Sequence, residues 1–300
     1  MSLETKGGRE PIPPARATQA ALAPGLYVVA TPIGNAEDIT LRALRVLRQA
    51  DVIACEDTRV SAKLLERHGI ATQRVAYHDH SGPRVAEALL DRIAGGAAVA
   101  LISDAGTPLL SDPGFPLVRD ALARGLAVTV LPGPAAPLAA LVLSGLPAER
   151  FLFAGFLPAK PAARQRALDE LKAVPATLLF LETAPRLADA LDDMAQVLGD
   201  RPAAVARELT KLHEEVRRAS LAALAAHYRE AGPPKGEIVM VVGPPGERAP
   251  ALDAAALDAK LAEALAAMSV KDASAAVAAA TGLPRRAVYA RALVLARRGG

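Results

Sequence analysis

The sequence predicts an α/β protein with two lobes, the first built on a parallel sheet, followed by a small helical module. Strand-like and helix-like segments alternate along the first half of the chain, which is the order that builds a parallel sheet. The strand-like segments are unbroken apolar runs, as expected for strands that are covered on both faces. The end of the chain shows helical periodicity alone, which indicates the separate module.

The composition is that of a folded protein with a large core. Of the 300 residues, 52% are hydrophobic and 22% are charged, which excludes disorder of the whole chain and is typical of soluble globular proteins. This length suggests about two domains. The formal net charge of +3 neither demands nor excludes a nucleic-acid partner. The single cysteine, Cys55, excludes an internal disulfide and a cysteine-based zinc site. We expect that Cys55 lies in the core and that the protein is cytoplasmic.

The sequence shows neither a signal-peptide pattern nor a membrane-spanning pattern. Residues 1–24 combine charges and prolines without the apolar stretch of a signal peptide, and we interpret them as a disordered N-terminal extension. The most apolar long segment, 131–147, is interrupted by four prolines. We therefore expect no membrane-spanning helix and no membrane partner.

The first lobe, expected over residues 25–148, alternates strands with helices. Strands, each with the loop that follows it, are expected in the segments 25–35, 51–58, 97–106 and 126–137. Helices are expected between them, over 38–50, 85–96 and 115–125. In the first helix Leu41, Leu44 and Leu47 recur at helical spacing, with Asp38 or Thr40 as the N-cap. Glycines end the other two helices.

The second lobe, expected over residues 149–246, contains both kinds of element again. Its strand-like segments are 177–183 and 237–246, and its helix-like segments are 186–199 and 220–232. A stretch rich in Pro and Gly, 243–254, is typical of a linker. Three short helices are expected within 257–298, with a turn at 282–284 where Thr281 or Pro284 marks the next helix start. Linker and module together span 247–300.

Four loops of the first lobe indicate a ligand site. They are rich in Gly, Pro, Asp or Thr and cover residues 31–35, 56–59, 103–114 and 132–136. Each follows a predicted parallel strand, and ligands of such sheets bind at the carboxyl ends of the strands. The loop 103–114, SDAGTPLLSDPG, also keeps Leu109 and Leu110, which a solvent-exposed turn does not need. We favour ligand binding over a proline-stiffened turn, although no dinucleotide or nucleoside-triphosphate motif is present.

Several charged motifs have both a functional and an ordinary interpretation. CEDTR places Glu56, Asp57 and Arg59 at a strand end; a surface ion pair is the ordinary interpretation, but the position favours function. The histidines of YHDHS, residues 77–81, are a weak metal pattern, and we favour a hydrogen-bonding loop there and expect no metal. In ELTKLHEE, Lys211 and Glu215 lie one helical turn apart, which suggests first a solvated salt bridge.

A set of motifs in a fixed order then resembles a known family. TPIGNAEDIT, EDTR, ISDAGTPLLSDPG, LPGPAA, GFLPAK, ELTK and GEIVMVVGP resemble the ribosomal RNA small-subunit methyltransferase I family, from Gly25 to the C-terminus. That family belongs to the tetrapyrrole-methylase-like enzymes that use S-adenosylmethionine. Two positions depart from the pattern: Ala36 stands where the family often has Leu, and Pro185 stands where it has His.

The resemblance implies a two-lobed tetrapyrrole-methylase-like fold with a mixed sheet in the second lobe, S-adenosylmethionine in the cleft between the lobes, and a homodimer. The segment 237–243 would approach the adenine. The positions that match the family's cofactor-lining stretches are Thr31, Pro32, Gly34, Asn35, Asp104, Ala105, Gly106, Thr107, Pro108, Ser111, Asp112, Gly114, Pro132, Gly133, Pro134 and Ala135.

The implied reaction is methylation of the ribose 2'-hydroxyl of a decoding-centre cytidine in 16S rRNA, free or within the 30S subunit. A carboxylate or a neutral amine would take the hydroxyl proton, and the candidates in order are Asp57, Glu182 and Lys211. Arg59 would assist the substrate pose. RNA phosphate would be bound by Lys160 and Arg186, and by Lys271, Arg285 and Arg286 of the basic module, unless the module is purely structural or forms the dimer.

Two other functions stay open at the level of sequence. A small-molecule methyltransferase, such as one acting on tetrapyrroles, would use the same fold but would not need the basic helical module. A non-catalytic RNA-binding assembly factor would keep the pocket without the chemistry. The Gly, Pro and Asp residues retained in all four loops favour the enzyme.

Overall fold

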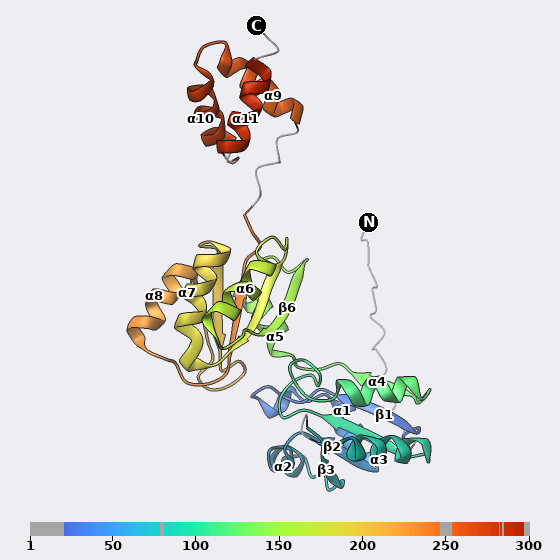
Figure 1. The fold of residues 1–300 in the computed structure, drawn as a ribbon. Coiled ribbons are helices and arrows are strands. Elements are labelled where there is room, and N and C mark those ends of the chain that lie inside the picture. The colour runs from blue at the N-terminus through green and yellow to red at the C-terminus, as the bar shows by residue number, and fades with distance from the viewer. Residues whose placement is uncertain (1–20, 79–80, 247–253, 282, 284, 297–300) are drawn as a thin grey trace, which may run out of the picture.

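The computed structural model of the chain describes residues 21–78, 81–246, 254–281, 283 and 285–296. Figure 1 shows two α/β lobes and a bundle of helices at the end of the chain. The first lobe has a five-stranded parallel sheet and the second a five-stranded mixed sheet, which confirms the predicted fold class. Most of the N-terminal extension, most of the linker and two residues of the turn at 282–284 lie outside the described residues.

The sheet of the first lobe is covered by helices on both faces. Its strands are β1 (Gly25–Val29), β2 (Val52–Cys55), β3 (Arg74–Ala76), β4 (Ala98–Ile102) and β5 (Val128–Leu131), in the order β3-β2-β4-β1-β5. Its helices are α1 (Leu41–Gln49), α2 (Thr58–Arg67), α3 (Pro83–Ala94) and α4 (Phe115–Ala123). Separate apolar clusters fill the two faces of the sheet. Burial on both sides explains why β2 and β4 are apolar throughout.

Local signals account for the ends of several helices. The Thr40 hydroxyl accepts a hydrogen bond from the Ala43 amide at 3.0 Å, so Thr40 is the N-cap of α1, one of the two caps predicted. Gly95 follows α3 and Gly125 follows α4 closely, as the sequence indicates. The elements α2 and β3 were not predicted. The half-buried β3 is too short to show a pattern.

The second lobe has helices on one face of its sheet and a single helix from the connection on the other. Its strands are β6 (Phe151–Phe156), β7 (Thr177–Glu182), β8 (Pro202–Arg207), β9 (Glu215–Ser220) and β10 (Ile238–Val242), in the order β6-β7-β10-β8-β9. Only β6 and β7 are parallel. The helices α6 (Pro161–Leu171), α7 (Leu187–Leu198) and α8 (Leu221–Ala231) cover one face.

The helix α5 (Ala136–Ser144) joins the two lobes. It follows β5 of the first lobe, but Ala140 and Leu141 pack against β7, β8 and β10 of the second sheet (Figure 1). The same apolar cluster includes Ile33 from the first lobe. This helix lies within the segment whose prolines argue against a membrane span; Pro137 sits in its first turn, where proline is tolerated. In the described part of the chain, no helix is both long and apolar enough to cross a membrane.

The segment ELTKLHEE is not a helix, and the expected pairing of Lys211 with Glu215 is wrong. Glu208 and Thr210 have left-handed φ angles of 50° and 65°, which a helix does not allow. The segment is instead the connection between the antiparallel strands β8 and β9. Lys211 pairs with Glu208, whereas Glu215 lies on β9 and pairs with Arg207.

The module at the end of the chain has three helices, as predicted, with a small core of its own. They are α9 (Ala254–Leu265), α10 (Val270–Thr281) and α11 (Arg285–Ala296). Leu261, Val277, Val288 and Ala292 are buried together between them. Thr281 ends α10 rather than starting the next helix. Lys271, Arg285 and Arg286 are all exposed on this module.

Candidate active site

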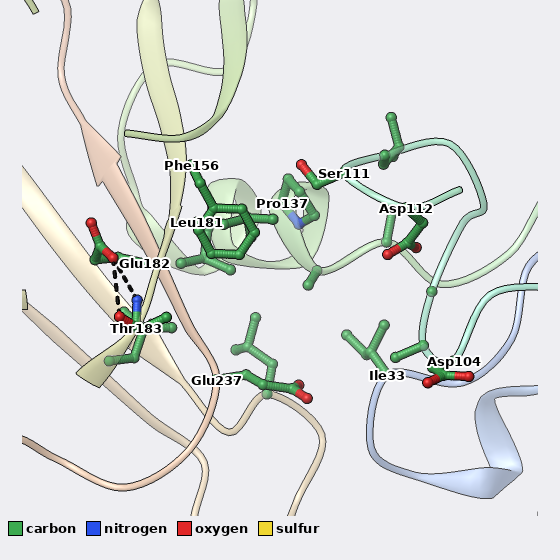
Figure 2. Close-up of a pocket in the computed structure, with 18 of the residues that line it drawn as sticks. Ile33, Asp104, Ser111, Asp112, Pro137, Phe156, Leu181, Glu182, Thr183 and Glu237 are labelled. Atoms are coloured by element: carbon green, nitrogen blue, oxygen red, sulfur yellow. Dashed lines mark hydrogen bonds between the residues drawn. The ribbon is translucent and has the colours of Figure 1, made fainter. Parts of the chain in front are cut away.

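A cavity of about 600 Å³ lies between the two lobes. In Figure 2 the first lobe contributes Ile33, Asp104, Ser111 and Asp112 on one side, and the second lobe contributes Phe156, Leu181, Thr183 and Glu237 on the other. The remaining lining residues are Glu56, Ala105, Gly106, Thr107, Leu110, Ala135, Ala136, Pro137, Glu182, Ala184, Pro185, Leu209, Gly236, Ile238 and Val239. Loops at the carboxyl ends of the parallel strands therefore form half of the cavity lining, where the sequence analysis expects a ligand.

Short hydrogen bonds hold the loop 103–114 against its neighbours. The amide of Thr31 donates to the carbonyl of Gly106 at 2.8 Å, and the amide of Gly106 donates to the carbonyl of Thr31 at 3.1 Å. The hydroxyl of Thr107 donates to the carbonyl of Pro134 at 2.9 Å. Three of the four predicted loops are thus tied together. Residues Leu109 and Ser111 have φ angles of 74° and 69°, so the loop keeps a conformation that its own sequence does not favour.

On the second-lobe side, Glu182 is a buried carboxylate with fixed partners. It ends β7, and its side chain is 0% exposed. One carboxylate oxygen accepts a hydrogen bond from the amide of Thr183 at 2.7 Å, and the other lies 3.1 Å from Nη2 of Arg186. The same Nη2 atom also donates to the carbonyl of Leu157 at 2.5 Å. Arg186 therefore neutralises Glu182.

A corner between the lobes brings the TPIGN and ELTK motifs into contact. The amide of Asn35 donates to the Thr210 hydroxyl at 2.9 Å. Gly34 lies so close to the turn that a Cβ there would be 2.5 Å from Cγ of Lys211 and 2.7 Å from Oγ1 of Thr210. Only glycine allows this approach. The two motifs, 175 residues apart in sequence, meet at the edge of the cavity.

The same corner contains a network of one lysine and two glutamates. Nζ of Lys211 lies 2.9 Å from Oε1 of Glu208 and 3.2 Å from Oε2 of Glu237. Burial alone would lower the pKa of Lys211, but hydrogen bonds to the two carboxylates outweigh it and raise that pKa. The hydrogen bond from Lys211 lowers the pKa of Glu208. Lys211 is therefore a cation at neutral pH.

The charged side chains that reach the cavity are acidic. Those of Glu56, Asp104, Asp112 and Glu237 are at least partly exposed, with Glu237 paired to Lys211, whereas the Glu182 carboxylate is fully buried beside Arg186. Figure 2 shows the Glu237 side chain directed across the cavity towards Ile33. Apolar side chains, including Phe156 and Leu181, lie between the acidic ones. The cavity suits a ligand that combines positive charge and hydroxyl groups with an apolar or aromatic part.

The predicted cofactor residues divide into two groups. The first lines the cavity and consists of Asp104, Ala105, Gly106, Thr107, Ser111, Asp112 and Ala135. The second lies outside the lining and consists of Thr31, Pro32, Gly34, Asn35, Pro108, Gly114, Pro132, Gly133 and Pro134. In that group Thr31 is buried, and Gly133 packs against Ala30.

Asp57 and Arg59 lie outside the lining. The carboxylate of Asp57 accepts hydrogen bonds from Nε of Arg59 at 3.1 Å and from its Nη2 at 2.7 Å. These bonds hold the pKa of Asp57 well below its usual range. Asp57 also caps α2, and its amide donates to Oδ1 of Asp104 at 3.1 Å. Asp57 thus touches the cavity only through Asp104, and the Arg59 side chain is 88% exposed.

The other predicted residues are spread over the chain. Lys160 is exposed at the start of α6. Arg186, predicted to bind RNA phosphate, is held by Glu182 and by the Leu157 carbonyl. Sequence reasoning did not select Glu56 as a site residue, although CEDTR contains it, nor Phe156, Leu181 and Thr183. The last three belong to the cavity because the second lobe packs over the first, which no local motif signals.

Comparisons with known proteins agree with this architecture. The family model described as Tetrapyrrole (Corrin/Porphyrin) Methylases matches residues 25–225, and the RsmI C-terminal HTH domain matches residues 251–296. The protein named ribosomal RNA small subunit methyltransferase I from Mesorhizobium japonicum is 52% identical over 275 residues, which cover 91% of this chain and 93% of the relative. The protein of that name from Erythrobacter litoralis is 54% identical over 274 residues, 91% of this chain and 96% of the relative.

The chain belongs to the ribosomal RNA small subunit methyltransferase I family. Solved structures of the same fold are more distant from this member of the family. Uroporphyrin-III C-methyltransferase from Thermus thermophilus, complexed with S-adenyl homocysteine, matches with a TM-score of 0.52 at 23% identity, over 73% of this chain and 97% of that one. Diphthine synthase matches with a TM-score of 0.55 at 17% identity, over 73% and 89%. At these identities, the two solved structures support the fold of the chain and nothing beyond the fold.

Among the residues that the structure describes, there is no group of three or more His, Cys, Asp or Glu side chains that could hold a metal ion. His80, one of the two histidines of YHDHS, lies outside that part. Cys55 is fully buried in the core of the first lobe, as predicted.

Proposed function

We propose that this protein transfers a methyl group from S-adenosylmethionine to the ribose 2'-hydroxyl of a decoding-centre cytidine in 16S rRNA. The observation that carries the proposal is the acid-lined cavity between the lobes, which is built from the motifs that mark the family. The names of the relatives support the RNA substrate. The 2'-oxygen and the cytidine come from the family resemblance.

The cavity suits S-adenosylmethionine in size and charge. Its volume of about 600 Å³ lies in the range of small-molecule sites. The cofactor is a net cation through its sulfonium and ammonium groups, which the carboxylates of Glu56, Asp104, Asp112 and Glu237 would attract. Asp104 and Asp112 would accept hydrogen bonds from its ammonium and ribose, and the backbone at 104–107 would approach it closely. Ile33, Leu209 and Val239 would pack against the adenine.

The protein's part in the reaction is to align the groups and to accept a proton. When bound, the cofactor supplies an electrophilic methyl group on a positive sulfonium. The two lobes exclude water and fix the line between the attacking oxygen and that methyl group, which is worth several powers of ten in rate. The ribose hydroxyl attacks well only if its proton has an acceptor within hydrogen-bond reach.

We propose Glu182 as this acceptor, because it is the only one of the three candidates whose residue belongs to the cavity wall; its carboxylate, fully buried beside Arg186, would have to turn into the cavity to take the proton. Lys211 keeps its proton at neutral pH and cannot act as a neutral amine. The positive charge of Lys211 instead holds the Glu237 carboxylate in place at the edge of the cavity. Asp57 is held by Arg59 outside the lining and is weakly basic, so it ranks below Glu182.

The remaining partners follow from exposed surfaces. We propose that the helical module docks on RNA through Lys271, Arg285 and Arg286, and that Lys160 contributes from the second lobe. Large apolar side chains are exposed on α4, β5 and α5, namely Phe115, Leu122, Val130, Leu138 and Val142, and they would form the homodimer interface. An enzyme with these partners would act in the cytoplasm.

The test is methyl transfer from radiolabelled S-adenosylmethionine to 30S subunits that lack the modification, with free 16S rRNA alongside. We expect label in the RNA, mapped to the 2'-oxygen of one cytidine. Cofactor binding is measured on the same preparation by calorimetry. If the cofactor binds but no RNA is labelled, the acceptor is a small molecule or the protein is a non-catalytic assembly factor.

A further inference from the structure

A second hollow, which we call the basic groove, lies beside the cavity on the second lobe. It has a volume of about 400 Å³ and is lined by Arg207, His213, Arg217, His227, Tyr228 and Lys235, among others. One short turn separates the two hollows. Lys235 lines the groove, whereas the next two residues, Gly236 and Glu237, line the cavity.

The groove carries an excess of positive charge. Nε of Arg207 lies 2.8 Å from one oxygen of Glu215, and Nη2 of Arg217 lies 3.0 Å from the other. One carboxylate therefore serves two guanidinium groups, and it also fixes their orientation. The other carboxylate of the groove, Glu208, is bound by Lys211. Lys235 adds a further cation at the exposed edge.

Neutral donors complete the lining. The Tyr228 side chain is buried, and this burial together with the charge of Glu215 raises the pKa of its hydroxyl. The hydroxyl therefore keeps its proton at neutral pH and can donate a hydrogen bond. His213 and His227 supply ring N–H groups beside it. Guanidinium, ammonium, hydroxyl and imidazole donors together match the oxygens of a phosphodiester.

The acid-lined cavity and the basic groove have opposite preferences. Among the described residues, the cavity lining contains carboxylates and no basic side chain, so it favours a cationic cofactor over phosphate. An RNA strand that offers one ribose hydroxyl to the cavity must therefore place its phosphates outside it. The basic groove adjoins the cavity across the turn at 235–237 and carries the opposite charge.

We propose that the basic groove binds a backbone phosphate of the RNA strand whose ribose is methylated. This inference rests on the proposed function, because it assumes that the ribose enters the cavity. The groove would then set the register of the strand against the cavity. Affinity from this contact depends on salt and not on base sequence.

The test compares Lys235→Ala and Lys235→Glu with Arg166→Ala, which removes an exposed positive charge from α6, away from both hollows. RNA binding is measured as a function of salt without turnover, and KM and kcat are measured with 30S subunits. For Lys235→Ala we expect KM for RNA to rise several-fold and the slope of log K against log salt to fall by about one. Lys235→Glu should raise KM further, with S-adenosylmethionine affinity unchanged. Arg166→Ala should change neither KM nor slope.

The proposal is overturned if the Lys235 variants bind RNA like the wild type, or if Arg166→Ala weakens binding to the same extent. The second result would show that only the overall charge matters. Failure of the proposed function gives a different result, because the wild type would then leave RNA unlabelled. The binding measurement does not depend on turnover, so it decides the role of the groove in either case.

Discussion

At the scale of residues, two carboxylates at strand ends have received very different surroundings. The Glu182 residue belongs to the cavity wall, but its carboxylate is fully buried and is neutralised by Arg186. Asp57 keeps 29% of its side chain exposed and is bonded to Arg59 and to the backbone of α2. The sequence ranks Asp57 first because it lies in EDTR. We place Glu182 first because it is the one candidate in the cavity wall, and a proton acceptor must come within reach of the reacting hydroxyl.

Amide substitutions separate these two candidates. Glu182→Gln should lower kcat by about a hundredfold or more, because positioned proton transfer contributes that much. Asp57→Asn should lower kcat less than about tenfold, since asparagine can also cap α2. S-adenosylmethionine affinity, measured by calorimetry, should change little in either variant. A larger loss of kcat in Asp57→Asn than in Glu182→Gln would restore Asp57 as the acceptor.

At the scale of elements, the connection between β8 and β9 does more than join two strands. Glu208 accepts a hydrogen bond from Lys211 and another from the amide of Glu237 at 3.1 Å. Its own amide donates to the carbonyl of Glu237, also at 3.1 Å. Glu208 therefore fixes both Lys211 and the residue that points into the cavity. Left-handed backbone at two positions of this connection is typical of a functional turn.

Gly236 gives a way to disturb this turn from the other side. Its φ is +99°, and a Cβ there would overlap the Glu208 carboxylate. Gly236→Ala should lower the free energy of unfolding by about 1–3 kcal/mol and also weaken S-adenosylmethionine binding. Gly96→Ala is the matched control, because Gly96 has a φ of +98° and nothing within 4 Å.

Denaturant titration and calorimetry report the two effects separately. Both variants should be less stable, but only Gly236→Ala should lose cofactor affinity. Equal cofactor affinity in the two variants would contradict a role for the Glu208 carboxylate in shaping the cavity.

At the scale of the whole molecule, we propose that function is divided between the lobes and the module. The cavity is formed by the lobes alone, and the apolar cluster of the module contains only residues of its own helices. Helices α10 and α11 carry the exposed cations Lys271, Arg285 and Arg286. If the module docks on RNA as proposed, its loss would change RNA affinity without changing cofactor binding.

Removal of residues 251–300 tests this division. RNA binding should weaken, and its salt dependence should become shallower by about one unit of slope per lost phosphate contact. Affinity for S-adenosylmethionine should stay within error of the full chain. RNA affinity that is unchanged after truncation would assign the module a structural role or a role in dimer formation.

The sequence predicted much of the fold because its signals are local. Apolar runs and helical spacing identified β1, β2, β4 and most of the longer helices. Two failures share one cause. The sequence analysis took ELTKLHEE as helical, because the backbone angles of this turn depend on its contact with TPIGN. It did not predict α5, because that helix packs against a sheet formed later in the chain.

The sequence by itself determined the fold class, the family and the loops that form the first-lobe half of the cavity. These follow from patterns within short stretches of chain and from the order of the motifs. Only the tertiary structure decided which carboxylates face the cavity, that Lys211 is a held cation, and that a basic groove lies beside an acidic cavity. Those properties arise where distant segments meet, since charge, burial and pKa depend on neighbours in space.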